Sequence, residues 1–320
     1  MTDRPVGFGR REAAGSGGAG TPDAVPGAET LDDAAASALL PDRPARGHKG
    51  DFGKLLVIAG SLDYAGAALL VCRAAGRAGA GLVTLAVPES LQPLFAAKVV
   101  EATTMALPED DVEEIDPEPA LARILDHDHD AIVVGPGLRP GLAAAELVRE
   151  LIAARADGAD EELPPIVLDA EALRSLASMD GWWDGPRRSA VLTPHAGEFE
   201  RLAGSPPGED RVGATRKLAD RLGVTVLLKG NITVIAEPGG LVYLNSAGQS
   251  WAATAGSGDV LSGIVGALLA AGLPSAQAAA AAAYVHARAA NLSAADPGPR
   301  PAPTSASRIL AHVRAAIASL

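Results

Sequence analysis

The sequence predicts an α/β fold with a central, mostly parallel sheet that is covered by helices on both faces. Short, uninterrupted apolar runs alternate with helix-like stretches from residue 54 onward, as expected for strands that are buried on both sides. Hydrophobic residues make up 48% of the chain but aromatic residues only 3%, so the core must consist mainly of Ala, Val, Leu and Ile. With 320 residues, the chain is long enough for one large domain of this class to bury such a core.

The N-terminal segment differs in composition from the rest of the chain. Residues 1–46 are rich in Gly, Ala, Pro, Asp and Thr and show no lasting periodicity, which is typical of disordered segments. We therefore expect residues 1–46 to form a mostly disordered tail, in which a short helix around Leu31–Leu40 could still form. Residues 47–320 are expected to form a single domain, because no repeat and no second domain is visible there.

The predicted strands are apolar runs that end in Gly, Ser, Asp, His or Lys. They cover residues 55–59, 82–87, 131–134, 166–168, 190–192 and 224–228, and a hairpin is expected from residues 232–237 and 241–245. The clearest helices are predicted at residues 65–78, 260–271, 276–291 and 305–319. In parallel sheets, ligands bind beyond the carboxyl ends of the strands. The polar residues at the strand ends are therefore the first candidates for chemistry.

Charge and composition exclude several classes of function. The net charge of -12 disfavours binding to nucleic acid and to anionic membranes. The longest apolar segment, Val260–Leu273, is interrupted by glycines and followed by Pro274, so it is too short to cross a bilayer. The single cysteine, Cys72, lies in an apolar context and is expected to be buried. One cysteine and no visible targeting segment predict a reducing compartment, the cytoplasm.

The strongest local motif is the glycine-rich turn Ala255–Asp259, which directly precedes the apolar helix. Glycines let backbone N–H groups face a ligand, and the helix start adds unpaired donors and a positive dipole end. This arrangement suits a transferring phosphoryl group, and Asp259 at its mouth could take the proton of an attacking hydroxyl. The alternative is that Asp259 only caps the helix. Burial of so apolar a helix favours the functional interpretation.

Two further strand ends carry candidate residues. His195 and Glu198 follow a predicted strand and are three residues apart, so Glu198 could hold a magnesium ion through water while His195 contacts substrate. The same spacing also suits a capping box at a helix start, and spacing alone does not separate the two. Lys229 ends another buried strand and suits phosphate contact, although a solvated lysine is the commoner case.

Two common nucleotide-binding motifs are absent. Near Lys54, the first glycine position of a P-loop is occupied by His48, and Leu55 follows the lysine. The segment Gly135–Pro140 has proline where a dinucleotide fingerprint requires its third glycine. Any nucleotide must therefore be bound by a different structural motif.

Eight segments in the same order resemble the ADP/ATP-dependent NAD(P)H-hydrate dehydratase family of the ribokinase-like superfamily. The resemblance extends from about residue 45 to residue 292, and each segment alone would be a weak indication. The matching segments are His48–Gly53, Ala59–Ser61 with Ala65–Ala68, Gly79–Thr84, Gly135–Leu138, Leu168–Ala170, Leu192–Phe199, Leu228–Asn231 and Gly256–Leu261. The sequence departs from the family pattern at a few positions, such as Ala196, where proline is usual.

The resemblance implies a ribokinase-like three-layer α/β/α fold and a lyase that dehydrates the S epimer of hydrated NADH or NADPH. ADP would be converted to AMP and phosphate, or ATP would serve in its place, with Mg²⁺ as cofactor. Ala67, Gly137, His195 and Asp259 match the positions that hold the hydrated nucleotide, with Asp259 as the catalytic base. Lys229, Gly230, Asn231, Ile232, Thr233 and Gly258 match the adenine-nucleotide site. Glu198 is a candidate Mg²⁺ contact, through water.

The resemblance also sets expectations about partners and rival functions. Relatives often form tetramers, so a homo-oligomer is expected, and the 46-residue tail is too short for the epimerase domain that some relatives carry. One alternative is a small-molecule kinase of the same superfamily, for a hydroxymethyl-pyrimidine or a sugar, although His195 in place of asparagine disfavours it. A non-catalytic nucleotide sensor is an alternative from another class, but it would not need the base Asp259.

Overall fold

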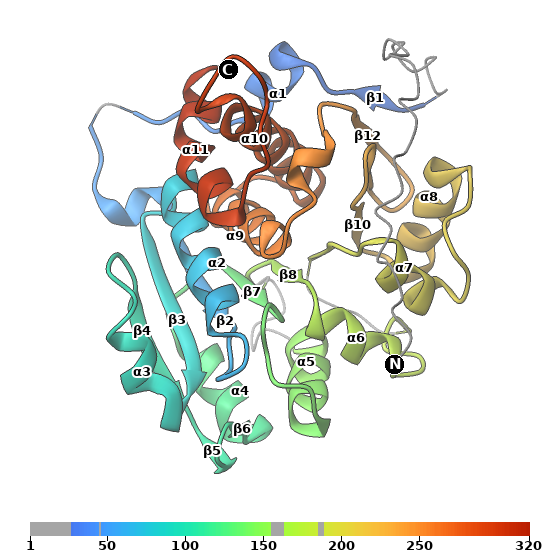
Figure 1. The fold of residues 1–320 in the computed structure, drawn as a ribbon. Helices are drawn as coiled ribbons and strands as arrows, with labels where there is room; N and C mark the ends of the chain where they lie inside the picture. The colour runs from blue at the N-terminus through green and yellow to red at the C-terminus, as the bar shows by residue number, and fades with distance from the viewer. Residues whose placement is uncertain (1–26, 45, 155–162, 185–188) are drawn as a thin grey trace, which may run out of the picture.

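The computed structural model describes residues 27–44, 46–154, 163–184 and 189–320, and its centre is one large twisted sheet (Figure 1). The sheet has ten strands in the order β1-β12-β11-β10-β9-β8-β7-β2-β3-β4. Its strands are β1 (Glu29–Thr30), β2 (Lys54–Ile58), β3 (Leu82–Pro88), β4 (Thr103–Leu107), β7 (Ala131–Val134), β8 (Ile166–Leu168), β9 (Ala190–Leu192), β10 (Thr225–Leu228), β11 (Thr233–Ala236) and β12 (Val242–Asn245). Among these described strands, only β11 pairs with its neighbours in antiparallel fashion, so the predicted, mostly parallel sheet is confirmed.

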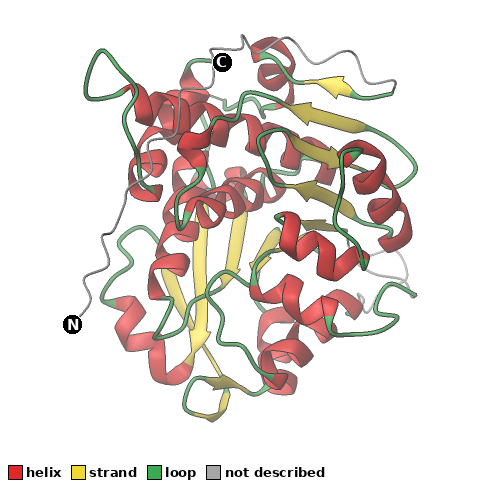
Figure 2. Ribbon diagram, turned by 45° about the vertical axis from the view of Figure 1, so that its right-hand side comes forward, coloured by secondary structure: helices red, strands yellow, loops and turns green. Residues whose placement is uncertain are grey.

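Helices cover both faces of the sheet and make the molecule a three-layer α/β/α sandwich (Figure 2). Side chains along each strand point alternately to the two faces of the sheet. In β2, Leu55 and Val57 belong to one core cluster, and Leu56 and Ile58 belong to the other. The first layer contains α1 (Asp33–Leu39), α2 (Ala65–Ala78), α9 (Ser257–Ala270), α10 (Ser275–Ala295) and α11 (Ala306–Ala318). The second contains α4 (Pro117–Leu125), α5 (Leu142–Ala153), α6 (Glu171–Ala177), α7 (Ala196–Ala203) and α8 (Arg211–Leu222).

Small residues determine how closely the helices of the first layer pack. Helix α10 is dominated by alanine, and most of its 21 residues are buried. In α9, a Cβ atom at Gly263 would lie 2.4 Å from the carbonyl oxygen of Val71 in α2. A Cβ atom at Gly266 would lie 2.4 Å from a methyl carbon of Val133 in β7. The absence of side chains at these two glycines therefore lets α9 lie close to α2 and to the centre of the sheet.

Some elements have no clear periodicity in the sequence and were not predicted. They include the edge strand β4, the small hairpin of β5 (Glu109–Asp111) and β6 (Glu114–Ile115), and the short helix α3 (Gln92–Ala96). The hairpin is made largely of acidic residues, so its sequence lacks the alternation of apolar and polar side chains that would indicate a strand.

The predicted N-terminal tail extends too far into the chain. Within it, β1 pairs with β12 at the edge of the sheet, and α1 forms near the position where a short helix was expected. Asp33 of α1 accepts hydrogen bonds from Tyr284 (2.6 Å) and Arg288 (2.7 Å) of α10. These contacts tie residues 29–39 to the domain, so the boundary predicted at residue 46 is wrong. The expectation of disorder for residues 1–26 lies outside the described residues.

Two smaller expectations also hold. No helix in the described ranges is long and apolar enough to cross a membrane. Cys72 is buried in α2, and burial raises the pKa of its thiol to about 12, so this cysteine is a packing residue and not a nucleophile.

Candidate active site

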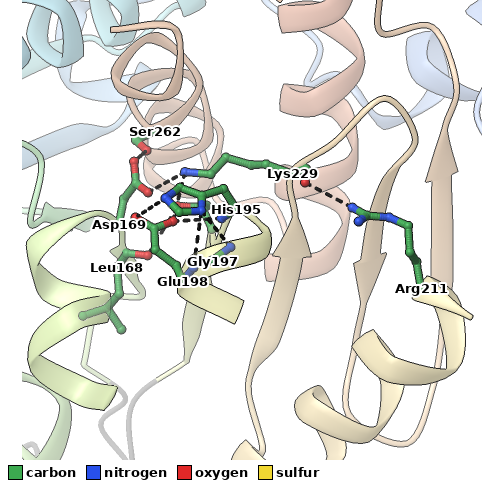
Figure 3. Close-up of polar contacts among 9 residues, drawn as sticks. Leu168, Asp169, His195, Gly197, Glu198, Arg211, Lys229 and Ser262 are labelled. Atoms are coloured by element: carbon green, nitrogen blue, oxygen red, sulfur yellow. Dashed lines mark hydrogen bonds and ion pairs between the residues drawn. The ribbon is translucent and has the colours of Figure 1, made fainter. Parts of the chain in front are cut away.

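Adjacent parallel strands bring three polar residues to one end of the sheet, and two of them, His195 and Lys229, are predicted site residues. Asp169 follows β8, His195 follows β9 and Lys229 follows β10, and these strands are neighbours in the sheet. Figure 3 shows the side chains of Asp169, Glu198 and Lys229 directed toward one another, next to Ser262 of α9. The carboxyl edge of the sheet therefore carries a cluster of charged groups, as the position of the strand ends predicts.

The first turn of α9 leaves backbone donors free. Gly256 caps the helix in the left-handed conformation, with φ 82°. In the described part of the chain, the N–H groups of Gly258 and Asp259 have no backbone acceptor. Unpaired donors at a helix start form a site for an anion. This geometry matches the predicted anion hole.

Asp259 is not the cap of that helix. The cap is Gly256, and Asp259 lies in the first turn without a side-chain capping bond. The capping interpretation of Asp259 is therefore wrong. Burial and the negative charge of Asp169 raise the pKa of Asp259 to about 6, against the opposing effect of Lys229. A carboxylate with a pKa near neutrality is suited to general base catalysis.

Lys229 is paired with carboxylates and is not a solvated strand end. Its Nζ lies 2.9 Å from Oδ1 of Asp169 and 3.7 Å from Oε2 of Glu198, and 21% of its side chain is exposed. Burial alone would lower the pKa of Lys229, but the charges of Asp169 and Glu198 outweigh it and raise the pKa. Lys229 is therefore a cation at the first turn of α9, which is called the mouth of α9 below. A Cβ atom at Gly258 in this turn would lie 3.6 Å from the Nζ of Lys229.

His195 and Glu198 form the capping box that the sequence allowed. The Nδ1 atom of His195 accepts hydrogen bonds from the N–H groups of Gly197 (3.0 Å) and Glu198 (3.3 Å). In return, the N–H group of His195 donates to Oε2 of Glu198 at 2.8 Å. Because Nδ1 is an acceptor, the neutral imidazole carries its proton on Nε2. The side chain of His195 is 57% exposed, so it can still contact a ligand.

A cavity of about 610 Å³ lies beside this cluster. Among the predicted nucleotide residues it is lined by Lys229, Gly230, Asn231, Thr233 and Gly258, and His195 also faces it. Ile232 is exposed and does not line the cavity. The volume is typical of small-molecule sites, which measure about 300–1,000 Å³.

Ala67 and Gly137 lie together next to this cavity and not within it. Gly137 has φ 67°, and a Cβ atom there would lie 2.9 Å from the Cβ of Ala67 and 2.7 Å from the carbonyl oxygen of Tyr64. Ala67 belongs to the first turn of α2. The same helix contacts the start of α9, where Gly256 approaches Leu70. Ala67 and Gly137 thus lie on the α2 side of the start of α9, whereas His195 lines the cavity together with the predicted nucleotide residues.

The structure adds polar residues that the sequence analysis did not select as site residues. Asp169 was only one of several strand ends, and Ser262 is a polar residue in an apolar helix, three positions after Asp259. His286 of α10 is buried and lies 3.0 Å from Oγ of Ser257. Burial lowers the pKa of His286 to about 4, so it is a neutral histidine that is paired with Ser257 at the wall of the cavity.

Arg211 contacts the nucleotide segment from behind. Its Nη2 donates to the carbonyl oxygen of Lys229 at 3.1 Å, and Figure 3 shows it on the side of Lys229 that faces away from Asp169. A Cβ atom at Gly230 would lie 2.6 Å from the same nitrogen. Burial lowers the pKa of Arg211. Nothing in the local sequence distinguishes this arginine from the other basic residues of α8.

Comparison with known proteins identifies related sequences. Residues 55–312 match the family model described as NAD(P)H-hydrate dehydratase. The chain is 53% identical over 264 residues to the bifunctional NAD(P)H-hydrate repair enzyme Nnr of Mycobacterium leprae, a match that covers 82% of this chain and 50% of that protein. It is 36% identical over 250 residues to the ADP-dependent (S)-NAD(P)H-hydrate dehydratase of Neisseria meningitidis, covering 77% of this chain and 78% of that protein. The chain thus spans about half the length of the bifunctional relative and most of the length of the other.

Solved structures with the same fold include a related dehydratase. The ADP/ATP-dependent NAD(P)H-hydrate dehydratase of Bacillus subtilis, co-crystallised with ATP and Mg²⁺, has a TM-score of 0.73 and 30% identity, covering 92% of this chain and 100% of that one. A ribokinase-like superfamily protein of Enterococcus faecalis has a TM-score of 0.75 at 23% identity, covering 92% of this chain and 97% of that one. The latter match supports the fold alone, and the predicted ribokinase-like architecture is confirmed.

Proposed function

Because the chain belongs to the NAD(P)H-hydrate dehydratase family, we propose that it removes water from the S epimer of hydrated NADH or NADPH, at the expense of ADP or ATP. One observation supports this most directly. Asp259, a carboxylate with a pKa raised to about 6 by burial and by Asp169, lies in the same helical turn as two unpaired backbone N–H groups. A base and an anion hole side by side are what phosphoryl transfer to a hydroxyl group requires.

In the first step, Asp259 takes the proton from the ring hydroxyl as its oxygen attacks the terminal phosphorus of the nucleotide. A new P–O bond forms, the phosphoanhydride bond breaks, and AMP leaves when ADP is the donor. The N–H groups of Gly258 and Asp259 and the ammonium of Lys229 face the negative charge that develops on the phosphoryl oxygens. Catalysis of this kind consists mostly of positioning and electrostatic stabilisation.

The second step is an elimination. The phosphorylated hydroxyl is a good leaving group, so phosphate departs from the ring while a proton leaves the adjacent carbon. The carbon–carbon double bond of the dihydropyridine forms again. The sum is hydrate plus ADP to NAD(P)H, AMP and phosphate, with no residue of the protein covalently modified.

We assign the two substrates to the two sides of the α9 mouth. The segment Lys229–Thr233, together with Gly258, would hold the adenine nucleotide in the cavity that most of these residues line. Ala67, Gly137, His195 and Asp259 would hold the hydrated nucleotide. His195 can donate through its exposed Nε2, because its Nδ1 already accepts two backbone hydrogen bonds.

The residues present are compatible with Mg²⁺ bound together with the nucleotide. The nearest partner of the Lys229 ammonium is Asp169, and the carboxylates of Glu198 and Asp259 add further negative charge beside it, which a second cation could balance. The described residues contain no group of three ligands that could hold a metal alone. Mg²⁺ commonly uses one or two carboxylates, waters and substrate phosphates. Glu198 would contact it through water, and Mg²⁺ would then neutralise charge on the phosphates.

We further propose that the enzyme works in the cytoplasm as a homo-oligomer, with a tetramer as the expected form. The single cysteine is buried and unpaired, which suits a reducing compartment. Light scattering on the purified chain tests the oligomeric state, and a monomeric mass would contradict the expectation.

The test of the proposed function is a direct assay with hydrated NADH. The purified chain is mixed with the hydrate, Mg²⁺ and either ADP or ATP, and the near-ultraviolet absorbance of the dihydropyridine is followed. We expect the absorbance to return in step with release of phosphate. Asp259→Asn should lose nearly all of the absorbance recovery. Asp130→Asn, which alters a carboxylate at the amino ends of the strands, should retain it.

The same assay separates the rival functions. A stable phosphorylated product, detected by mass spectrometry with no recovery of absorbance, would indicate a small-molecule kinase of the same superfamily. Nucleotide binding without release of AMP or phosphate from any candidate substrate would indicate a sensor. Either result would contradict the proposed dehydratase activity.

A further inference from the structure

We propose that Asp169 is a positioning residue that holds the side chain of Lys229 over the first turn of α9, where the phosphates of the nucleotide bind. The inference rests on the proposed nucleotide site and names a residue that the resemblance did not assign. Asp169 itself would touch neither substrate.

Both oxygens of Asp169 are engaged within the protein. Oδ1 accepts from Nζ of Lys229 at 2.9 Å, and Oδ2 accepts from Oγ of Ser262 at 2.7 Å. The residue is only 2% exposed. Burial alone would raise its pKa, but Lys229, followed by Ser262 and Thr193, lowers it. Asp169 is therefore an ionised carboxylate with no free face toward a ligand, and it can act only through its partners.

The backbone holds Asp169 in place from both sides. The next residue, Ala170, has φ 50°, a left-handed conformation that is strained for alanine. A Cβ atom at Gly135 would lie 1.9 Å from the carbonyl oxygen of Asp169, so only glycine allows this approach. Such strain persists where the surroundings fix the conformation, and here it directs the carboxylate toward Lys229.

The main chain of Lys229 is fixed as well, which leaves its side chain as the variable part. Its N–H group donates to the carbonyl oxygen of Pro194 at 2.8 Å, and its carbonyl oxygen accepts from Arg211 at 3.1 Å. An ammonium group has three donors, of which Asp169 uses one. The group lies above Gly258 and borders the cavity, so the remaining donors can reach a phosphate there.

Loss of Asp169 should release the lysine from this position. Glu198, at 3.7 Å from Nζ, would then be the nearest carboxylate and would draw the ammonium toward the capping box of α7. A nucleotide would have to pull Lys229 back from that site, which weakens binding. In a variant without Lys229, by contrast, Asp169 has nothing to position.

The test is a double-mutant cycle on ADP affinity, measured by titration calorimetry in Mg²⁺ buffer with the full chain. The variants are Asp169→Asn, Lys229→Met and the double variant. We expect Asp169→Asn to weaken ADP binding in the wild-type background, within the range of about 2- to 150-fold that coupled contacts produce. In the Lys229→Met background, the same substitution should change ADP affinity by less than about twofold.

Thermal stability measured on the same four proteins tests the pairing of Asp169 with Lys229 independently of the nucleotide. Asp169→Asn should lower the melting temperature of the wild type, but it should raise that of Lys229→Met, because it removes a buried carboxylate that has lost its partner. Asp130→Asn is the matched control, because Asp130 lies at the amino ends of the strands, away from the site. It accepts the N–H of Lys54 at 2.8 Å, and its replacement should leave ADP affinity unchanged.

Should Asp169→Asn fail to fold, Ser262→Ala replaces it, since it loosens Asp169 without removing a charge. Its loss of ADP affinity should be smaller and should again vanish in the Lys229→Met background. Equal losses in both backgrounds, or unchanged ADP affinity in Asp169→Asn, would overturn the inference, as would a wild type that does not bind ADP. A wild type that binds ADP but does not dehydrate the hydrate would contradict only the proposed function.

Discussion

Replacement of Asp259 by asparagine should make the protein more stable while making it inactive. Asp259 has no side-chain capping bond, and burial and the charge of Asp169 raise its pKa from 3.8 to about 6. An ionised carboxylate in this position is unfavourable for folding, since its neighbours oppose its charge more than Lys229 favours it. Asparagine keeps the shape and removes the charge.

The expected gain in stability of Asp259→Asn can be worked out from the rise in the pKa of Asp259. A rise of about two pKa units corresponds to about 3 kcal/mol of differential interaction, and partial exposure of the side chain reduces this to about 1–2 kcal/mol. For a domain of this size the melting temperature should therefore increase by about 2–8 °C at pH 7. Turnover of the hydrate should fall by about 10²–10⁴, the usual loss when a general base is removed.

The gain in stability of Asp259→Asn should depend on pH. Because the pKa of Asp259 is raised in the folded state, its contribution to stability is complete below pH 3.8 and is lost as the pH rises through about 6. The advantage of Asp259→Asn should therefore shrink as the pH falls from 7 toward 4. Differential scanning fluorimetry across this range measures it, alongside the absorbance assay.

The control is a carboxylate that does cap a helix. Asp32 accepts from the N–H of Ala35 at 2.8 Å, so Asp32→Ala should lose about 0.5–2 kcal/mol of stability and retain turnover. If Asp259→Asn lowered the melting temperature at pH 7, or if its effect did not vary with pH, the electrostatic argument for Asp259 would be wrong.

Three other outcomes are expected. Turnover should fall about tenfold between pH 7 and pH 5, because Asp259 must be ionised to act as a base; a flat profile in steady-state kinetics would refute this. Chelation of Mg²⁺ should abolish turnover and added Mg²⁺ should restore it, with Glu198→Gln raising the Mg²⁺ concentration required; full activity in EDTA would contradict the assignment. Gly266→Ala places a Cβ atom 2.4 Å from Val133 and should cost about 1–3 kcal/mol in chemical denaturation, whereas an unchanged midpoint would show that the helix can shift.

Most of the architecture could be predicted because the central strands of the sheet are short apolar runs between turn residues. The hairpin of β11 and β12 and the buried helix α9 follow from the same patterning. Strand β1 was not predicted, and α1 was expected only as a possible short helix within the N-terminal segment, because both elements depend on contacts with β12 and α10. Such docking depends on tertiary contacts that local composition does not encode.

The candidate site was predictable in its parts but not in its connections. Strand ends selected His195 and Lys229, and the glycine turn selected Asp259. The pairing of Lys229 with Asp169, 60 residues away, depends on the order of strands β8, β9 and β10, which a single sequence does not give. The role of Asp259 at the helix start depended on which glycine adopts the left-handed conformation, and only the backbone geometry identifies Gly256.

The close packing of α9 also bears on how this protein can lose its proposed function. Gly263 and Gly266 lie about 6 and 10 Å along the helix axis from Asp259, in contact with α2 and the sheet. Because α9 lies so close to its neighbours at both glycines, a displacement caused there should shift the first turn of the helix as well. Loss-of-function screens should therefore recover substitutions at these two glycines, and their kinetic defects should resemble those of damage to the reaction centre itself.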